Sequence, residues 1–291
     1  MTVPFVIRRA VLLLTLSIRP NRSRKTMRRI PALFVFALGV APLFSPGPAV
    51  LGQQLSYRLP SPATAVYQMV DTTVGTMTSP DGASDISGNS NITYTLSFEP
   101  DGEGVRASVD LTDFTGGIQP PMGAPMSVSQ TQAGLRSYVV RLDGRGLDEF
   151  AAGQRRRSPS QLPLFVDAWE AMFPRLPVGE VDPGDSWVDT VTTWVAGDGE
   201  RVVAYTYTLD SETTVDGRRQ LRVAISGDAR LTVTEGGTPT SIDGTETGFF
   251  LWDIERGLVA LWEVSRRYEG NIPNEPVSVT FTATTRVRLT N

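Results

Sequence analysis

The residues best placed to do chemistry are three carboxylates in the segment LPVGEVDPGDSW at 176–187. Glu180, Asp182 and Asp185 could converge as a carboxylate cluster for catalysis or as an oxygen-rich site for a hard cation. The same spacing suits a turn, in which Asp185 binds the turn backbone and Trp187 packs into the core at the start of a strand. We favour the turn, because surface carboxylates in turns are common and the spacing matches no calcium loop.

Other charged groups lie among Gly, Ser and Thr residues that are typical of turns. Three acidic pairs are interpreted as parts of solvated loops: Asp243 with Glu246, Asp198 with Glu200, and Asp81 with Asp85. The arginine run at 155–157 could meet an anionic partner, but such a run is more often an exposed loop.

Composition closes most routes to catalysis. The chain has no His and no Cys, and Lys25 is its only lysine. Ser–His–Asp and Cys–His catalysis need His, Schiff-base chemistry needs Lys, and zinc sites are built mainly from Cys and His. Carboxylate chemistry and an all-oxygen cation site remain. We therefore assign no catalytic residue, metal ligand or cofactor, and ligand-binding residues stay unknown at this stage.

The N-terminal region is typical of an export leader. Its apolar run at 30–44 is about 15 residues long and is interrupted by Pro31, Gly39 and Pro42. A membrane-spanning helix needs about 20 mostly apolar residues, whereas a basic pair (Arg28-Arg29) before a short apolar run indicates a secretory signal. Without a cysteine at the cleavage point, the leader is not that of a lipoprotein.

We expect translation to start at Met27 and cleavage to fall between Gly52 and Gln53, with a cut after Ala49 as the competing site. A real extended leader that includes residues 1–26 is the alternative. Removal of residues 1–52 leaves 19 basic against 31 acidic residues, a net charge of −12. Such a charge disfavours nucleic acid and anionic lipid surfaces. We expect a periplasmic or extracellular protein with no membrane span after cleavage.

Alternation of apolar and polar residues predicts antiparallel strands throughout the rest of the chain. The clearest alternating segments are 92–98, 105–111, 203–209, 221–225 and 277–289. Asp-Gly hairpin turns are predicted at 100–104, 143–146 and 215–217, and a Gly/Pro loop at 116–126.

One short helix is predicted near 160–173. Ser160 is its expected N-cap and Pro174 ends it. Its apolar stripe consists of Leu164, Phe165, Ala168, Trp169 and Met172. The fold class is therefore mainly β (α+β), with large, curved, half-barrel-like antiparallel sheets.

Two β-meanders of similar plan are expected, at 53–158 and 187–291, joined by the helix and turn at 159–186. The strand–turn–strand segments at 94–111 and 205–225 resemble each other. An Asp followed by Arg-Gly-Leu also recurs in 139–150 and 249–262. Duplication explains both parallels, and chance similarity of hairpins is the alternative.

The chain resembles a group of uncharacterised secreted bacterial β-rich proteins, a domain of unknown function. The matching features are Asp143 to Gly146, the segment Leu162 to Phe173, the turn motif LP…VxxGDxW formed by Leu176-Pro177, Val181, Gly184, Asp185 and Trp187, and DIERG at 253–257. This resemblance implies a fold and an exported location, and it carries over no activity.

Aromatic residues crowd the second half of the chain: Tyr205, Tyr207, Phe249, Phe250, Trp252, Trp262 and Tyr268. They could line a trough for a lipid or another apolar ligand, although large aromatics more often fill a core. We predict a non-catalytic exported protein that binds an apolar small molecule or lipid on a concave sheet face. A carboxylate-dependent envelope hydrolase, tested at Asp182 and Asp185, and a structural or interaction module are the alternatives. The oligomeric state stays open.

Overall fold

The computed structural model describes residues 52–120, 124–129, 137–150, 168–195, 199–235, 238–272 and 277–291. Four expectations fall wholly or mostly outside these ranges: the leader up to residue 51, the helix residues 160–167, the arginine run at 155–157, and Asp198. Among the described residues, no helical segment combines the length and hydropathy that crossing a membrane requires.

Fourteen strands and one short helix make up the described part of the chain. The strands are β1 (Gln53–Gln54), β2 (Thr64–Ser79), β3 (Gly82–Asp101), β4 (Gly104–Gln119), β5 (Met126–Val128), β6 (Tyr138–Leu142), β7 (Leu147–Phe150), β8 (Glu180–Val181), β9 (Ser186–Val195), β10 (Gly199–Val215), β11 (Arg218–Glu235), β12 (Thr238–Asp253), β13 (Leu258–Ile272) and β14 (Val277–Leu289). The helix is α3 (Trp169–Met172).

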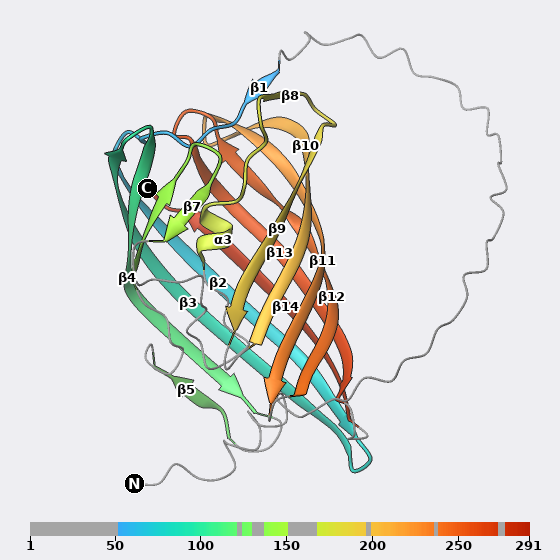
Figure 1. Cartoon of the computed structure of the whole chain (residues 1–291). Coiled ribbons are helices and arrows are strands. Elements are labelled where there is room, and N and C mark those ends of the chain that lie inside the picture. Colours follow the sequence, from blue (N-terminus) through green and yellow to red (C-terminus); the bar gives the residue numbers. More distant parts are fainter. Residues whose placement is uncertain are drawn as a thin grey trace, which may run out of the picture.

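A single antiparallel sheet contains twelve of these strands and curls into a half-barrel (Figure 1). Its order is β7-β6-β4-β3-β2-β14-β13-β12-β11-β10-β9, with β5 paired beside the end of β4. Among the described strands, β7 and β9 form the two edges of this sheet. The mainly-β, half-barrel prediction is therefore confirmed.

Residue alternation explains why the strands form and which way they face. β14 spans the same residues, 277–289, that the alternating pattern predicted, and its first residue Val277 and later Val287 are buried. Along β13, Trp262, Val264, Arg266 and Tyr268 are buried, whereas the alternate residues between them are not. One face of the sheet thus carries the core and the other faces solvent.

The predicted Asp-Gly turns are hairpins. Asp101 pairs with Gly104 at one turn and Val215 with Arg218 at another. At the second turn, Asp216 and Gly217 have positive φ angles of 52° and 78°. Positive φ at both central residues is the geometry that favours Asp-Gly between two strands.

The predicted loop at 116–126 is wrong for its first residues. β4 continues to Gln119, and Gly116 pairs with Ser90 of β3. The Phe114 ring occupies the space beside Gly116, where a Cβ would lie 2.8 Å from the Phe114 Cζ atom. Glycine is tolerated in this strand because a neighbouring side chain fills the place of its own.

Each half of the chain forms a run of consecutively paired strands. β2, β3 and β4 pair in order with β6 and β7, and β9 to β14 do the same. Pairing of β14 with β2 joins the two runs into one sheet. Duplication and the boundaries 53–158, 159–186 and 187–291 stay predictions.

The helix α3 lies within the predicted range of 160–173 and contacts β13 of the curled sheet. Figure 1 shows it inside the curl, between β7 and β9. All four of its residues are buried, including Glu170 at 4 % exposure. A buried carboxylate on this short helix needs partners, and these partners define the candidate site.

Candidate functional site

The carboxylates of 176–187 form a turn. Glu180, Asp182 and Asp185 are all exposed. The Asp182 amide donates to Asp185 Oδ2 at 2.9 Å, and the Asp185 amide donates to the Asp182 carbonyl oxygen, also at 2.9 Å. Trp187 follows in β9, where its ring stacks on Tyr207 with centroids 5.6 Å apart. The turn interpretation is therefore confirmed.

The loop interpretation of the acidic pairs holds for Asp81, which lies in a turn. It is wrong for Asp85 in β3, for Glu200 in β10, and for Asp243 and Glu246 in β12. Asp81, Asp85 and Asp243 are exposed, but Glu246 is completely buried in the middle of β12. The Gly and Thr residues around it suggested a turn, whereas they are strand positions, and Gly244 among them leaves room for the Tyr268 ring.

Arg201 of β10 is the centre of a buried ion network. Its Nη1 lies 2.8 Å from Glu170 Oε2, and its Nη2 lies 2.6 Å from Glu246 Oε1. The Arg201 side chain is 7 % exposed, and those of Glu170 and Glu246 are 4 % and 0 % exposed. The network thus connects α3 to the concave face of β10 and β12.

Two tyrosines and a second arginine complete the partners of Glu246. The hydroxyl groups of Tyr205 and Tyr268 donate to it at 2.6 Å and 2.8 Å. Arg266 Nε donates to Glu246 Oε2 at 3.2 Å. The Tyr205 hydroxyl also makes a very short hydrogen bond with Glu170. Both carboxylates are therefore fully engaged by guanidinium and phenol groups.

Two glycines make this geometry possible. Gly227 of β11 lies between Tyr205 and Glu246 in register, so the Tyr205 ring can cross it to reach β12. A Cβ at Gly227 would lie 2.8 Å from Tyr205 Cδ1, and one at Gly244 would lie 2.5 Å from Tyr268 Cδ1. The rings thus occupy the space that other side chains would fill.

A polar arm continues the network onto β14 and β2. Arg266 donates to the Thr285 hydroxyl, which donates to Asp71, both over very short distances. Asp71 is 2 % exposed. Burial raises the pKa of Asp71, although its hydrogen bond from Thr285 and the charge of Arg266 oppose the effect.

Glu246 behaves in the opposite way. Its burial acts to raise the pKa, but Arg201, Arg266 and the hydrogen bond from Tyr205 outweigh burial and lower the pKa to about 2. Burial and the charge of Glu246 raise the pKa of Tyr268 to about 12, although the charge of Arg201 opposes them. The network therefore holds Glu246 ionised and Tyr268 protonated across the neutral range.

A cleft of about 280 Å³ opens beside this network, between the sheet edges β7 and β9. Its apolar lining is Leu147, Trp169, Phe173, Pro174, Val191 and the Tyr207 ring, and its polar lining is Asp148, Glu170, Arg175, Asp189 and Thr190. Glu170 thus belongs both to the buried network and to the wall of the cleft.

Hydrogen bonds fix the segment that forms the cleft wall after α3. The Leu176 amide donates to the Arg145 carbonyl oxygen at 2.6 Å. The Tyr57 hydroxyl donates to the Pro174 carbonyl oxygen at 3.0 Å. Gly146 has a φ of +146°, and a Cβ there would lie 3.0 Å from the Pro174 carbonyl oxygen. The predicted turn at 143–146 therefore needs its second glycine for this close contact.

The crowded aromatics form a core. Tyr205, Tyr207, Phe250, Trp252, Trp262 and Tyr268 are at most 3 % exposed. Phe250 stacks on Trp262 with centroids 6.0 Å apart. Phe249 points to the other face, where the Arg222 guanidinium lies 4.6 Å from its ring centroid. Of this set, only Tyr207 lines the cleft.

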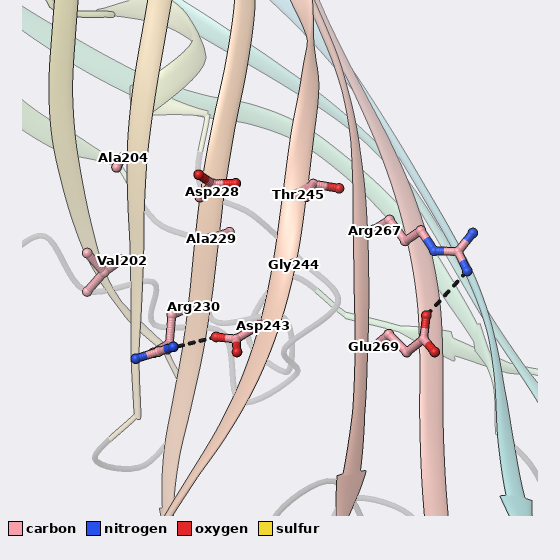
Figure 2. A pocket seen from close by; sticks show the side chains of 10 residues that line it. All are labelled: Val202, Ala204, Asp228, Ala229, Arg230, Asp243, Gly244, Thr245, Arg267 and Glu269. Carbon is pink, nitrogen blue, oxygen red and sulfur yellow. Dashed lines mark hydrogen bonds and ion pairs between the residues drawn. The ribbon is translucent and has the colours of Figure 1, made fainter. Parts of the chain in front are cut away.

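A shallow groove of about 790 Å³ lies on the opposite, convex face over β10 to β13 (Figure 2). Its charged side chains pair with one another. Arg230 Nε lies 2.7 Å from Asp243 Oδ1, and Arg267 Nη2 lies 3.4 Å from Glu269 Oε2. These pairs are exposed and leave few free groups for a ligand.

Sequence reasoning missed Arg201, Arg266 and Glu170, and it misplaced Glu246. A signal was present in the alternation itself. Arg266 falls on the same face of β13 as Trp262 and Val264, and Arg201 falls on the same face of β10 as Val203. A charge on the apolar side of an alternating strand needs a buried partner.

Comparison with known proteins gives no family. No protein-family model matches the chain, and no curated protein matches it significantly.

Several solved structures show a distant likeness to the chain, and three of them follow. An outer membrane channel from Pseudomonas putida F1 is 10% identical with a TM-score of 0.22, over 84% of this chain and 100% of the other. A DUF1329 family protein from Desulfovibrio piger is 11% identical with a TM-score of 0.15, over 76% and 85%. An outer membrane lipoprotein-sorting protein domain from Vibrio parahaemolyticus is 6% identical with a TM-score of 0.12, over 77% and 83%. At these TM-scores the likenesses support no conclusion about function.

Proposed function

We propose that the protein is an exported, non-catalytic binding protein of the cell envelope or its surroundings. Its ligand binds at the margin of the concave face, in the cleft between β7 and β9. The export part of the proposal depends on the leader predicted at 1–52. The binding part depends on one observation, a cleft whose wall includes Glu170 of the buried network.

The nature of the cleft favours a partly apolar ligand. Trp169, Phe173 and Val191 supply apolar surface, while Glu170 and Asp189 supply carboxylates. The open surface of the cleft is more polar than apolar, so polar groups of the ligand would make most of the contacts. A volume of about 280 Å³ suits a small molecule, or one end of a larger amphipathic molecule, rather than a whole lipid.

The hydrolase alternative gains no support from the geometry. Asp182 and Asp185 hold a surface turn together, and Glu246 lies beneath Arg201 and Tyr205, away from the cleft lining. A carboxylate pair that hydrolyses glycosides must reach both sides of the scissile bond. The oxygens of Glu170 and Glu246 instead accept hydrogen bonds from Arg201 and Tyr205. Those of Glu246 also accept from Arg266 and Tyr268.

Native mass spectrometry tests the proposal. The protein is purified without detergent from the compartment of cells that export it, and its mass is measured intact and after denaturation. We expect a chain that begins at Gln53 and carries a small molecule that denaturation releases. Protein that is consistently empty, from several growth conditions, contradicts binding, and a chain that keeps residues 30–44 contradicts export by cleavage.

A further inference from the structure

Within the proposed binding function, we infer that the cleft between β7 and β9 recognises an organic cation, a protonated amine carried on an aromatic or aliphatic body. The inference extends the proposed function by naming the chemical class of the ligand. It depends on the charge that remains unpaired in the cleft and on the buried hydroxyl group beside it.

The one basic side chain among the cleft residues is already neutralised. Arg175 Nη2 lies 3.0 Å from Asp143 Oδ2, and its Nη1 donates to Asp143 Oδ1 at 3.2 Å. This two-point contact leaves little of the Arg175 charge to attract an anion. An anionic ligand is therefore disfavoured.

Of the three acidic residues, one lacks an ionic partner. Asp148 lies 3.8 Å from Arg141, and Glu170 is held by Arg201. Asp189 of β9 is half-buried and makes no ion pair within the described residues. A half-buried carboxylate at the wall of a cleft attracts a cation more strongly than an exposed one, because water screens it less.

A buried hydroxyl group points to the same place. Tyr207 is 1 % exposed and lines the cleft. Within the described part of the chain, its ring contacts Trp187, Tyr205 and Phe250. A phenol oxygen at the wall of a cleft can accept a hydrogen bond from a ligand or from water. An ammonium N–H is a suitable donor.

The aromatic walls favour an organic cation. Trp169 and Phe173 both line the cleft, and ring faces attract ammonium groups in addition to the carboxylate. Trp169 is held edge-on by Phe150 at a centroid distance of 5.9 Å, and Phe173 by Tyr57 at 6.2 Å. These contacts fix the rings in advance, so little ordering is needed on binding.

Titration calorimetry with three matched probes tests the inference: benzylammonium, benzyl alcohol and benzoate. The protein is the exported chain at pH 7 and low salt. We expect benzylammonium to bind at least about tenfold more tightly than benzyl alcohol, and benzoate not to bind. Asp189→Asn should weaken benzylammonium about tenfold while leaving benzyl alcohol unchanged, and Tyr207→Phe should weaken it several-fold. Asp182→Asn removes an equivalent carboxylate outside the cleft and should leave all three probes unaffected.

The outcomes separate the two proposals. Equal binding of benzylammonium and benzyl alcohol, or preference for benzoate, overturns the cation inference and leaves the binding function in place. Equal losses in Asp189→Asn and Asp182→Asn also overturn it, because the attraction would then come from the overall negative charge. Failure of all three probes, together with empty protein in native mass spectrometry, overturns both.

Discussion

Removal of the Arg201 guanidinium is the perturbation that bears most on the buried network. Arg201→Met keeps an unbranched, apolar side chain of similar length but leaves Glu170 and Glu246 without their shared cation. Glu246 keeps Arg266, whereas Glu170 keeps only the Tyr205 hydroxyl among its described partners. Removal of one partner from a buried pair costs about 3–5 kcal/mol, since it leaves an uncompensated charge.

The matched control is Arg230→Met on the convex face. Arg230 and Asp243 form an ion pair with side chains 64% and 71% exposed. Water screens an ion pair this exposed, so its removal in the control should change stability little. Urea unfolding followed by tryptophan fluorescence measures both variants. With a slope of about 2–3 kcal/mol per molar urea, Arg201→Met should lower the midpoint by more than about 1 M.

A second variant shows whether the loss comes from charge. Glu170→Gln combined with Arg201→Met removes the carboxylate that Arg201→Met leaves without a cation, and should recover part of the lost stability. The reasoning is refuted if Arg201→Met and Arg230→Met shift the midpoint equally, or if the double variant loses as much as the sum of its two single changes.

Three further predictions concern the same network. Glu246, whose pKa is lowered to about 2, should stay ionised at pH 3 in carboxyl-carbon NMR, and titration of this group near pH 4.5 would contradict the prediction. Its ionised form should contribute about 3 kcal/mol to the free energy of unfolding above pH 4.5, and this contribution should fall as the pH drops toward 2. The pKa of Asp71 is raised, so the wild type loses stability as the pH rises from 3.8 through the folded-state pKa. Asp71→Asn keeps an acceptor for Thr285, so at pH 7 the variant should be as stable as the wild type or more stable. The difference in unfolding free energy between the two proteins should vanish below pH 3.8. A loss of more than about 1 kcal/mol in the variant at pH 7 argues against a raised pKa of Asp71. Gly227→Ala places a Cβ 2.8 Å from the Tyr205 ring, so it should lower the free energy of unfolding by about 1–3 kcal/mol, measured by heat or urea. An unchanged unfolding midpoint would show that the ring has room to move.

The alternation of apolar and polar residues made the fold class predictable, because each strand buries the side chains on one face and exposes those on the other to solvent. β14 was predicted to its first and last residue, and the Asp-Gly turns at 101–104 and 215–218 were placed correctly. The length of β4 was missed because Gly116 and Gly117 look like loop residues. Their neighbours on β3 and the Phe114 ring, which the local sequence does not show, decide their conformation.

The candidate site was the harder part. Its members lie far apart in sequence, since Glu170 and Glu246 meet through Arg201 only when the sheet curls around α3. The motif that stood out, at 176–187, is distinctive because a tight turn demands Pro, Gly and Asp in fixed order. A search for charges on the apolar face of β10 and β13 would have found the two arginines, but not the helix residue that joins them.

An electron-density map of the protein purified, without added ligand, from cells that export it would show directly whether the cleft holds a ligand. We expect density for a small molecule between β7 and β9, in contact with Trp169 and Phe173 and within hydrogen-bond distance of Asp189. Density among the packed rings of Phe250 and Trp262, or an empty cleft in protein that native mass spectrometry shows to be loaded, would contradict it.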